Sequence, residues 1–91
     1  MDQQEAANIL EDMLLAMVTA LVDDEDSINI STTPAGGTVV FEVDVAKGDV
    51  GKLIGRSGKT AGALRHILGA ASAKLRVRSI LAIPDKKSES E

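Results

Sequence analysis

Apolar residues near the N-terminus recur at intervals of three and four positions, the period of a helix that buries one face. The pattern runs from Gln3 to Val22, and Asp2 followed by Glu5 has the spacing of a capping box at its start. We therefore expect an amphipathic helix whose acidic polar face would be repelled by an anionic membrane. Its buried stripe should comprise Ala6, Ile9, Leu10, Met13, Leu14, Met17, Val18 and Leu21.

Two segments with a period of two follow, after an acidic run from Asp23 to Asp26. We expect that run to be a solvated linker, because it lacks the spacing of a calcium loop. The alternating segments are Ser27 to Thr33 and Thr38 to Val45, and the turn residues Pro34-Ala35-Gly36-Gly37 between them predict a hairpin. In the second strand the inward positions should be Val39, Phe41, Val43 and Val45, with Glu42 and Asp44 facing outward.

The helical period returns in the second half of the chain. Lys47 to Ile54 suits a short helix, Gly55 to Gly58 interrupts it, and Lys59 to Leu75 suits a longer helix. The buried positions of the longer helix should be Ala61, Leu64, Ile67, Leu68, Ala71 and Leu75. Its interior glycines, Gly62 and Gly69, each cost about 1 kcal/mol relative to alanine, which indicates close approach by a strand, a partner or RNA.

A last strand from Arg76 to Ile83 is ended by Pro84, and the polar residues Asp85 to Glu91 are expected to form a disordered tail. The helix pair between the second and third strands is long enough for a crossover, so these strands should pair in parallel. We therefore predict one α+β domain over residues 1–84, in the order helix-strand-strand-helix-helix-strand. A three-stranded sheet on one side should pack on three helices on the other.

The composition is that of a small folded protein: 91 residues, 44% hydrophobic and 26% charged. The absence of cysteine excludes disulfides, thiolate metal sites and a cysteine nucleophile. No apolar segment reaches the roughly 20 residues of a membrane span, and the first residues do not form a secretory signal. We expect a soluble, cytoplasmic protein that is not an enzyme and has no metal or cofactor.

The net charge of −4 hides a division of the chain. Residues 1–46 carry ten acidic side chains and no lysine or arginine, whereas residues 47–84 carry eight basic side chains and only one acid, Asp49. A phosphate backbone responds to the local field, so the basic half can bind nucleic acid. The alternative is two solvated faces of opposite charge. Under that alternative, Arg76 and Arg78 could pair with Glu42 and Asp44 across strands.

Two four-residue motifs with glycine at both ends are present, Gly48 to Gly51 and Gly55 to Gly58. The first contains Asp49, which would repel a phosphate, and lies inside the predicted short helix. The second contains Arg56, is flanked by Lys52 and Lys59, and lies between two helices. Glycines allow a sugar-phosphate chain to approach the backbone, and the next helix presents the positive end of its dipole. The second motif is therefore the candidate phosphate-binding loop.

The run from Gly51 to Arg65, GKLIGRSGKTAGALR, resembles the signature of the KH domain. More narrowly, it resembles the small bacterial single-KH proteins of the KhpA (YlqC) family, and the likeness covers nearly the whole chain in the type II KH order. Two positions depart from the family pattern: Thr60, where a larger apolar residue is common, and Lys47-Gly48, where proline and an acid are common.

The resemblance implies a loop that clamps the backbone of about four nucleotides of single-stranded RNA. The RNA-binding residues it implies, together with the neighbouring cations, are Gly55, Arg56, Ser57, Gly58, Lys59, Lys52, Ile54, Ala61, Leu64 and Arg65. It also implies an RNA chaperone or post-transcriptional regulator linked to cell elongation, envelope growth and cell shape. Such proteins pair with themselves or with a KhpB (Jag)-like KH protein.

Other functions account for the sequence less well. A protein-interaction adaptor would use the acidic first helix or the face that carries Gly62 and Gly69 for assembly. A nucleotide-hydrolysing loop is excluded, because Leu53 stands where the P-loop needs its first glycine. An RRM or cold-shock domain needs aromatic platforms, and Phe41 is the only aromatic residue. His66 has no evident catalytic partner, so a place on the helix surface is expected.

Overall fold

The computed structural model describes residues 1–84. Its main helices and strands follow each other in the expected order. The expected tail from Asp85 to Glu91 lies outside the described residues. Three short 3-10 turns connect the main elements, at Glu25–Ser27, Lys47–Asp49 and Arg56–Gly58. The main elements are α1 (Gln3–Leu21), β1 (Asn29–Ala35), β2 (Thr38–Asp44), α2 (Val50–Ile54), α3 (Lys59–Leu75) and β3 (Arg78–Ala82).

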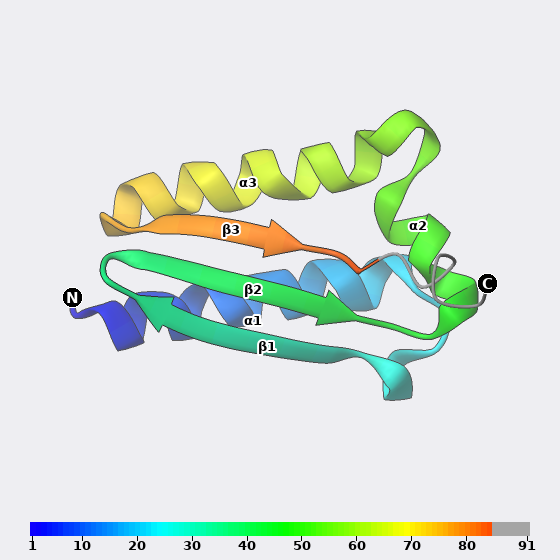
Figure 1. Ribbon diagram of the computed structural model, residues 1–91, viewed down its shortest axis with the longest axis horizontal. Helices are drawn as coiled ribbons and strands as arrows, with labels where there is room; N and C mark the ends of the chain where they lie inside the picture. Colours follow the sequence, from blue (N-terminus) through cyan, green and yellow to red (C-terminus); the bar gives the residue numbers. More distant parts are fainter. Residues whose placement is uncertain (85–91) are drawn as a thin grey trace.

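The three strands form one sheet in the order β1-β2-β3. β1 pairs with β2 antiparallel, and β3 pairs with β2 in parallel, so the predicted crossover through α2 and α3 is confirmed. The helices lie together in one layer over the sheet, with α3 running alongside β3 (Figure 1). This is the two-layer α+β architecture of a single KH-like domain in the type II order.

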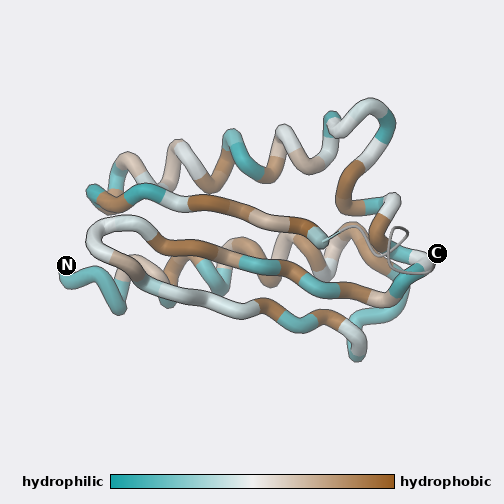
Figure 2. Tube along the Cα trace, in the orientation of Figure 1, coloured by the Kyte–Doolittle hydropathy of each residue, from teal (hydrophilic) through white to brown (hydrophobic). Residues whose placement is uncertain are grey.

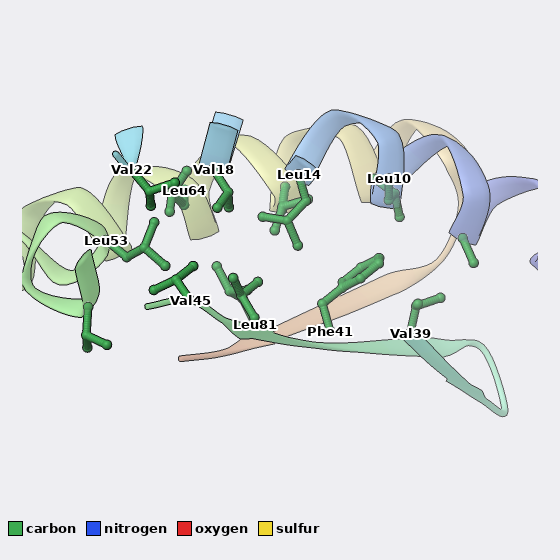
Figure 3. Packing of buried hydrophobic residues seen from close by; sticks show 14 residues of the cluster. Leu10, Leu14, Val18, Val22, Val39, Phe41, Val45, Leu53, Leu64 and Leu81 are labelled. Atoms are coloured by element: carbon green, nitrogen blue, oxygen red, sulfur yellow. The ribbon is translucent and has the colours of Figure 1, made fainter. Parts of the chain in front are cut away.

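The core lies between the helices and β2, whose hydrophobic positions alternate with Glu42 and Asp44 (Figure 2). Figure 3 shows side chains from α1, α2 and α3 pointing toward those of the sheet. Phe41, the largest fully buried side chain, lies at the centre of β2. The other fully buried large residues are Leu10, Leu14, Val18, Val39, Val43, Val45, Leu53 and Leu68.

Three residues predicted for the core are exposed: Ile9 by 46%, Leu21 by 36% and Ile67 by 49%. Ile9 is five residues from Leu14, so these two side chains point about 140° apart around α1. Leu21 and Ile67 instead line an apolar surface hollow between α1 and α3. A period of three and four therefore overestimates the width of the face that a three-stranded sheet covers.

The hairpin is tighter than predicted, because β1 continues through Pro34 and Ala35. Only Gly36 and Gly37 form the turn, with φ of 55° and 86°, the positive values that a two-residue hairpin turn requires. Proline is tolerated in β1 because that strand lies at the edge of the sheet.

The expected pairing of Arg76 and Arg78 with Glu42 and Asp44 across strands is wrong, because the strand register places neither arginine beside either acid. The register of β3 places Ala82 beside Glu42 and Arg78 beside Thr38. Arg76 precedes the strand and forms the C-cap of α3. Both arginines are exposed, so their charges face solvent at the start of β3.

Candidate nucleic-acid interface

The loop from Gly55 to Gly58 has a backbone that most side chains disfavour. Gly55, Ser57 and Gly58 have φ of 75°, 57° and 75°. The loop is closed at its two ends, by the Gly55 N–H donating to Gly51 O at 2.8 Å and the Gly58 N–H donating to Gly55 O at 3.1 Å. Arg56 and Ser57 are exposed at its tip. The sequence places a turn here, and the structure makes it a narrow, projecting one.

Gly55 is required for a steric reason as well. A Cβ at this position would overlap the Thr60 side chain and lie 2.8 Å from the Thr60 backbone nitrogen. Thr60 therefore packs directly against the loop, which gives a structural role to the residue that departs from the family pattern. Gly58 has nothing within 4 Å of such a Cβ, so only its backbone angle favours glycine there.

The first turn of α3 continues the loop without a side-chain cap, since its N-cap is Gly58. The unpaired N–H groups and the helix dipole create a positive potential at this end. Arg56 and Lys59 are exposed beside it, and neither makes an ion pair within residues 1–84. Backbone donors therefore meet two cations that are unpaired among the described residues at one end of α3, an arrangement that suits a phosphate.

Lys52 is held elsewhere, although the sequence groups it with the loop. Its ammonium lies 3.4 Å from Asp23 and 3.3 Å from Asp49. The Asp49 side chain is buried and accepts a hydrogen bond from the Asp24 N–H at 3.0 Å. This cluster ties the end of the α1 linker to α2, so the acidic linker is not wholly solvated as expected.

The protonation of that cluster follows from its contacts. The Asp24 N–H, with smaller contributions from the Asp23 N–H and Lys52, holds the pKa of Asp49 below its ordinary value despite burial. Hydrogen bonds to Asp49 and then to Asp23 raise the pKa of Lys52. Both groups are charged at neutral pH, so the cation is neutralised where it lies.

The remaining predicted site residues lie at the packing surface of α2 and α3. Ala61 and Leu64 are buried, and Ile54 is half-buried against the core. Arg65 is exposed, yet its Nε and Nη2 donate to Leu81 O on β3 at 3.2 and 3.1 Å. The guanidinium is thereby fixed beside β3.

A surface hollow of about 250 Å³ lies beside Arg65, and it includes residues that the sequence reasoning missed. Ser79 and Ile80 of β3 line it, and Ile80 is 53% exposed. The sequence signal for an exposed apolar residue was the adjacent pair Ile80 and Leu81. Neighbouring residues in a strand point to opposite faces, so only one of the two can face the core. Only Leu81 of the pair is needed in the core.

Within the described part of the chain, no helix is long and apolar enough to cross a bilayer. Among the same residues, no group of three or more His, Asp or Glu side chains is placed to hold a metal ion.

A family model described as "KhpA/KhpB, KH domain" matches residues 11–83. RNA-binding protein KhpA of Chlamydia trachomatis is 31% identical over 78 residues, covering 86% of this chain and 100% of that protein. RNA-binding protein KhpA of Borreliella burgdorferi is 41% identical over 69 residues, covering 76% of this chain and 84% of that protein. The Treponema pallidum protein of the same name is 35% identical over 75 residues, covering 82% and 94%.

Proposed function

The chain belongs to the KhpA/KhpB family of KH domains, and we propose that it binds short single-stranded RNA through the loop Gly55 to Gly58. KH domains are binding modules rather than enzymes, and they use such a loop to clamp the backbone of about four nucleotides. The observation that carries the proposal is the meeting of a positive-φ loop, a helix start without a side-chain cap, and two cations, Arg56 and Lys59, that make no ion pair within residues 1–84.

The proposed mechanism is electrostatic and steric. The N–H groups of Gly55, Gly58 and Lys59 already donate within the chain, so the other backbone N–H groups of the loop and the first turn of α3 donate to phosphate oxygens. Arg56 and Lys59 supply charge. The glycines leave room for the sugar-phosphate chain. Ile54 is half-buried and supplies apolar surface for bases, whereas Ala61 and Leu64 are buried and support that surface from beneath. Arg65 borders it. Lys52 contributes to the field only, because Asp23 and Asp49 hold it.

A single small site binds weakly, so useful affinity calls for a second site on a partner. We propose a homodimer or a complex with a second, KhpB-like KH protein, acting as an RNA chaperone or post-transcriptional regulator in the cytoplasm. Control of cell elongation or envelope growth is the physiological role that the family implies. The absence of cysteine suits a reducing compartment.

One observation favours a second candidate function, a protein-interaction adaptor. Leu21 and Ile67 are exposed and line an apolar hollow between α1 and α3 together with Met17, Ala20 and Ala63. Sizing the protein with and without RNase separates the two functions. An assembly that persists without RNA and an absence of bound RNA would favour the adaptor.

The proposed clamp is tested by the clamp variant, Arg56→Asp with Ser57→Asp. Aspartate tolerates the left-handed backbone of position 57, so the fold should be retained. We expect loss of the electrophoretic shift of cellular RNA, with circular dichroism unchanged. An unchanged shift would disprove the clamp.

A matched control keeps the overall charge the same as in the clamp variant. The charge-control variant combines Asn8→Asp, Leu15→Glu and Thr33→Glu, three exposed positions on α1 and β1. Both variants lower the net charge by three. If the charge-control variant lost RNA binding equally, general repulsion rather than the loop would be responsible.

A further inference from the structure

A groove between α3 and β3 continues well beyond the hollow beside Arg65. That hollow shares Ser79 and Ile80 with a second one of about 430 Å³. The second shares Val77 with a third of about 530 Å³, at the C-terminal end of α3. α3 and β3 run side by side (Figure 1), and the three hollows follow one another from the middle of α3 to its end, where Met1, Gln3 and Gly37 also line the third.

The middle of the groove is kept open by small residues. Gly69, Ser72 and Ala73 of α3 line it opposite β3. Glycine inside a helix costs about 1 kcal/mol relative to alanine. No described atom lies within 4 Å of a Cβ built at Gly69, so packing within the chain does not require glycine. Of the three neighbours expected at the interior glycines, a described strand is excluded at Gly69, which leaves a partner or RNA.

The far end of the groove is basic. Lys74 and Arg76 line the third hollow and Arg78 lines the second, and none of the three makes an ion pair within residues 1–84. Arg76 has φ of 64° in the C-cap of α3, a position that favours glycine or asparagine. The helix dipole favours a cation anywhere in the last turn, but it does not require an arginine in this disfavoured conformation.

Resting on the proposed clamp, we propose that this groove extends the RNA site to the C-terminal end of α3. A strand held at Gly55 to Gly58 runs along β3, and its outer phosphates contact Lys74, Arg76 and Arg78. An acidic peptide would match these charges, but the groove follows the same helix whose first turn carries the clamp, which favours the same nucleic acid strand.

The length of α3 sets the size of the extended site. Its 17 residues span about 25 Å. A stacked strand advances about 3.4 Å per nucleotide, so this distance accommodates at most about seven nucleotides. The clamp alone holds about four. RNA of four nucleotides should therefore miss the basic end, whereas RNA of ten nucleotides should reach it.

The test uses the groove variant, Lys74→Gln with Arg76→Asn and Arg78→Gln, which removes the charges. Asparagine suits the left-handed backbone, so stability should be retained. Affinities for single-stranded RNAs of four and ten nucleotides are measured by NMR titration. We expect about a tenfold loss on the longer RNA and less than about twofold on the shorter. The salt slope on the longer RNA should fall by about 2, or roughly 0.7 for each lost phosphate contact.

Two further variants separate a groove from general attraction. The charge-control variant has the same net charge change and should retain binding of the longer RNA. Gly69→Leu fills the groove without changing charge, and it should lower the affinity for the longer RNA but not for the shorter one.

Equal binding of the longer RNA by the groove variant and the wild type would overturn the extension, while the clamp could still stand. Unchanged binding of both RNAs by the clamp variant would instead disprove the proposed function. If the groove variant lost binding of an acidic peptide but kept binding of both RNAs, the extension would also be overturned.

Discussion

Replacing Gly55 with alanine should destabilise the protein far more than the same change at Gly58, although both glycines have φ of 75°. At Gly58, ψ is 14°, which is the ordinary left-handed region, and a Cβ meets nothing within 4 Å. Alanine there should cost about 1 kcal/mol. Gly58→Ala is therefore the matched control for the backbone angle alone.

At Gly55, ψ is 171°, a region that is essentially restricted to glycine and costs about 1–3 kcal/mol for other residues. The added Cβ would also meet the Thr60 backbone nitrogen at 2.8 Å, and a backbone atom cannot rotate away. Forced overpacking adds about 1–3 kcal/mol. We expect Gly55→Ala to lose about 3 kcal/mol of unfolding free energy, roughly 2 kcal/mol more than Gly58→Ala.

The assay is urea denaturation followed by far-ultraviolet circular dichroism, because the chain has no tryptophan or tyrosine to report by fluorescence. Adding Thr60→Ala to Gly55→Ala removes the hydroxyl but leaves the backbone nitrogen, so only part of the stability should return. If Gly55→Ala and Gly58→Ala were equally stable, the steric argument would be refuted.

Further predictions concern the buried acid and the core. Asp49 has a folded pKa below its ordinary value of 3.8, so its carboxylate stabilises the fold above about pH 4, and this contribution is lost as pH falls through the folded pKa. Asp49→Asn should therefore flatten the acid limb of a stability–pH curve. Phe41→Ala should cost about 3–5 kcal/mol in the same denaturation assay, because a fully buried ring is lost from the core. Ile80→Ala, at a residue 53% exposed, should cost less than about 1 kcal/mol; equal losses would contradict the assignment of the core.

Local patterns were sufficient for most of the elements. The bounds of α3, Lys59–Leu75, agree with those predicted, and the capping box of Asp2 and Glu5 forms both of its hydrogen bonds. Helix periodicity, capping and glycine breaks act over a few residues, so the sequence reveals them directly. The ends of β1 and β3 were less well predicted, because strand ends depend on the partner strand as much as on the segment itself.

Which cations are free could not be predicted in this way. Lys52 and Arg56 both flank or occupy the glycine loop, but Asp23 and Asp49 hold Lys52, whereas Arg56 stays unpaired within residues 1–84. Asp49 stands three positions before Lys52, a spacing at which helical side chains meet, so that half of the pairing was visible in the sequence. Asp23 lies 29 positions before Lys52, so no local pattern links those two. The same holds for Arg65, which donates to a carbonyl on β3, 16 positions away.

The amino-acid sequence by itself determined the type II KH order, the position of the glycine loop and the division of charge between the two halves. These features depend on residue type and short spacing. Only the tertiary structure decided that Asp23 also holds Lys52, that Ile67 is exposed, and that Gly69, Arg76 and Arg78 line hollows near the one beside Arg65. The physical reason is that packing α3 against a three-stranded sheet brings distant residues together, and burial, pairing and exposure follow from those contacts.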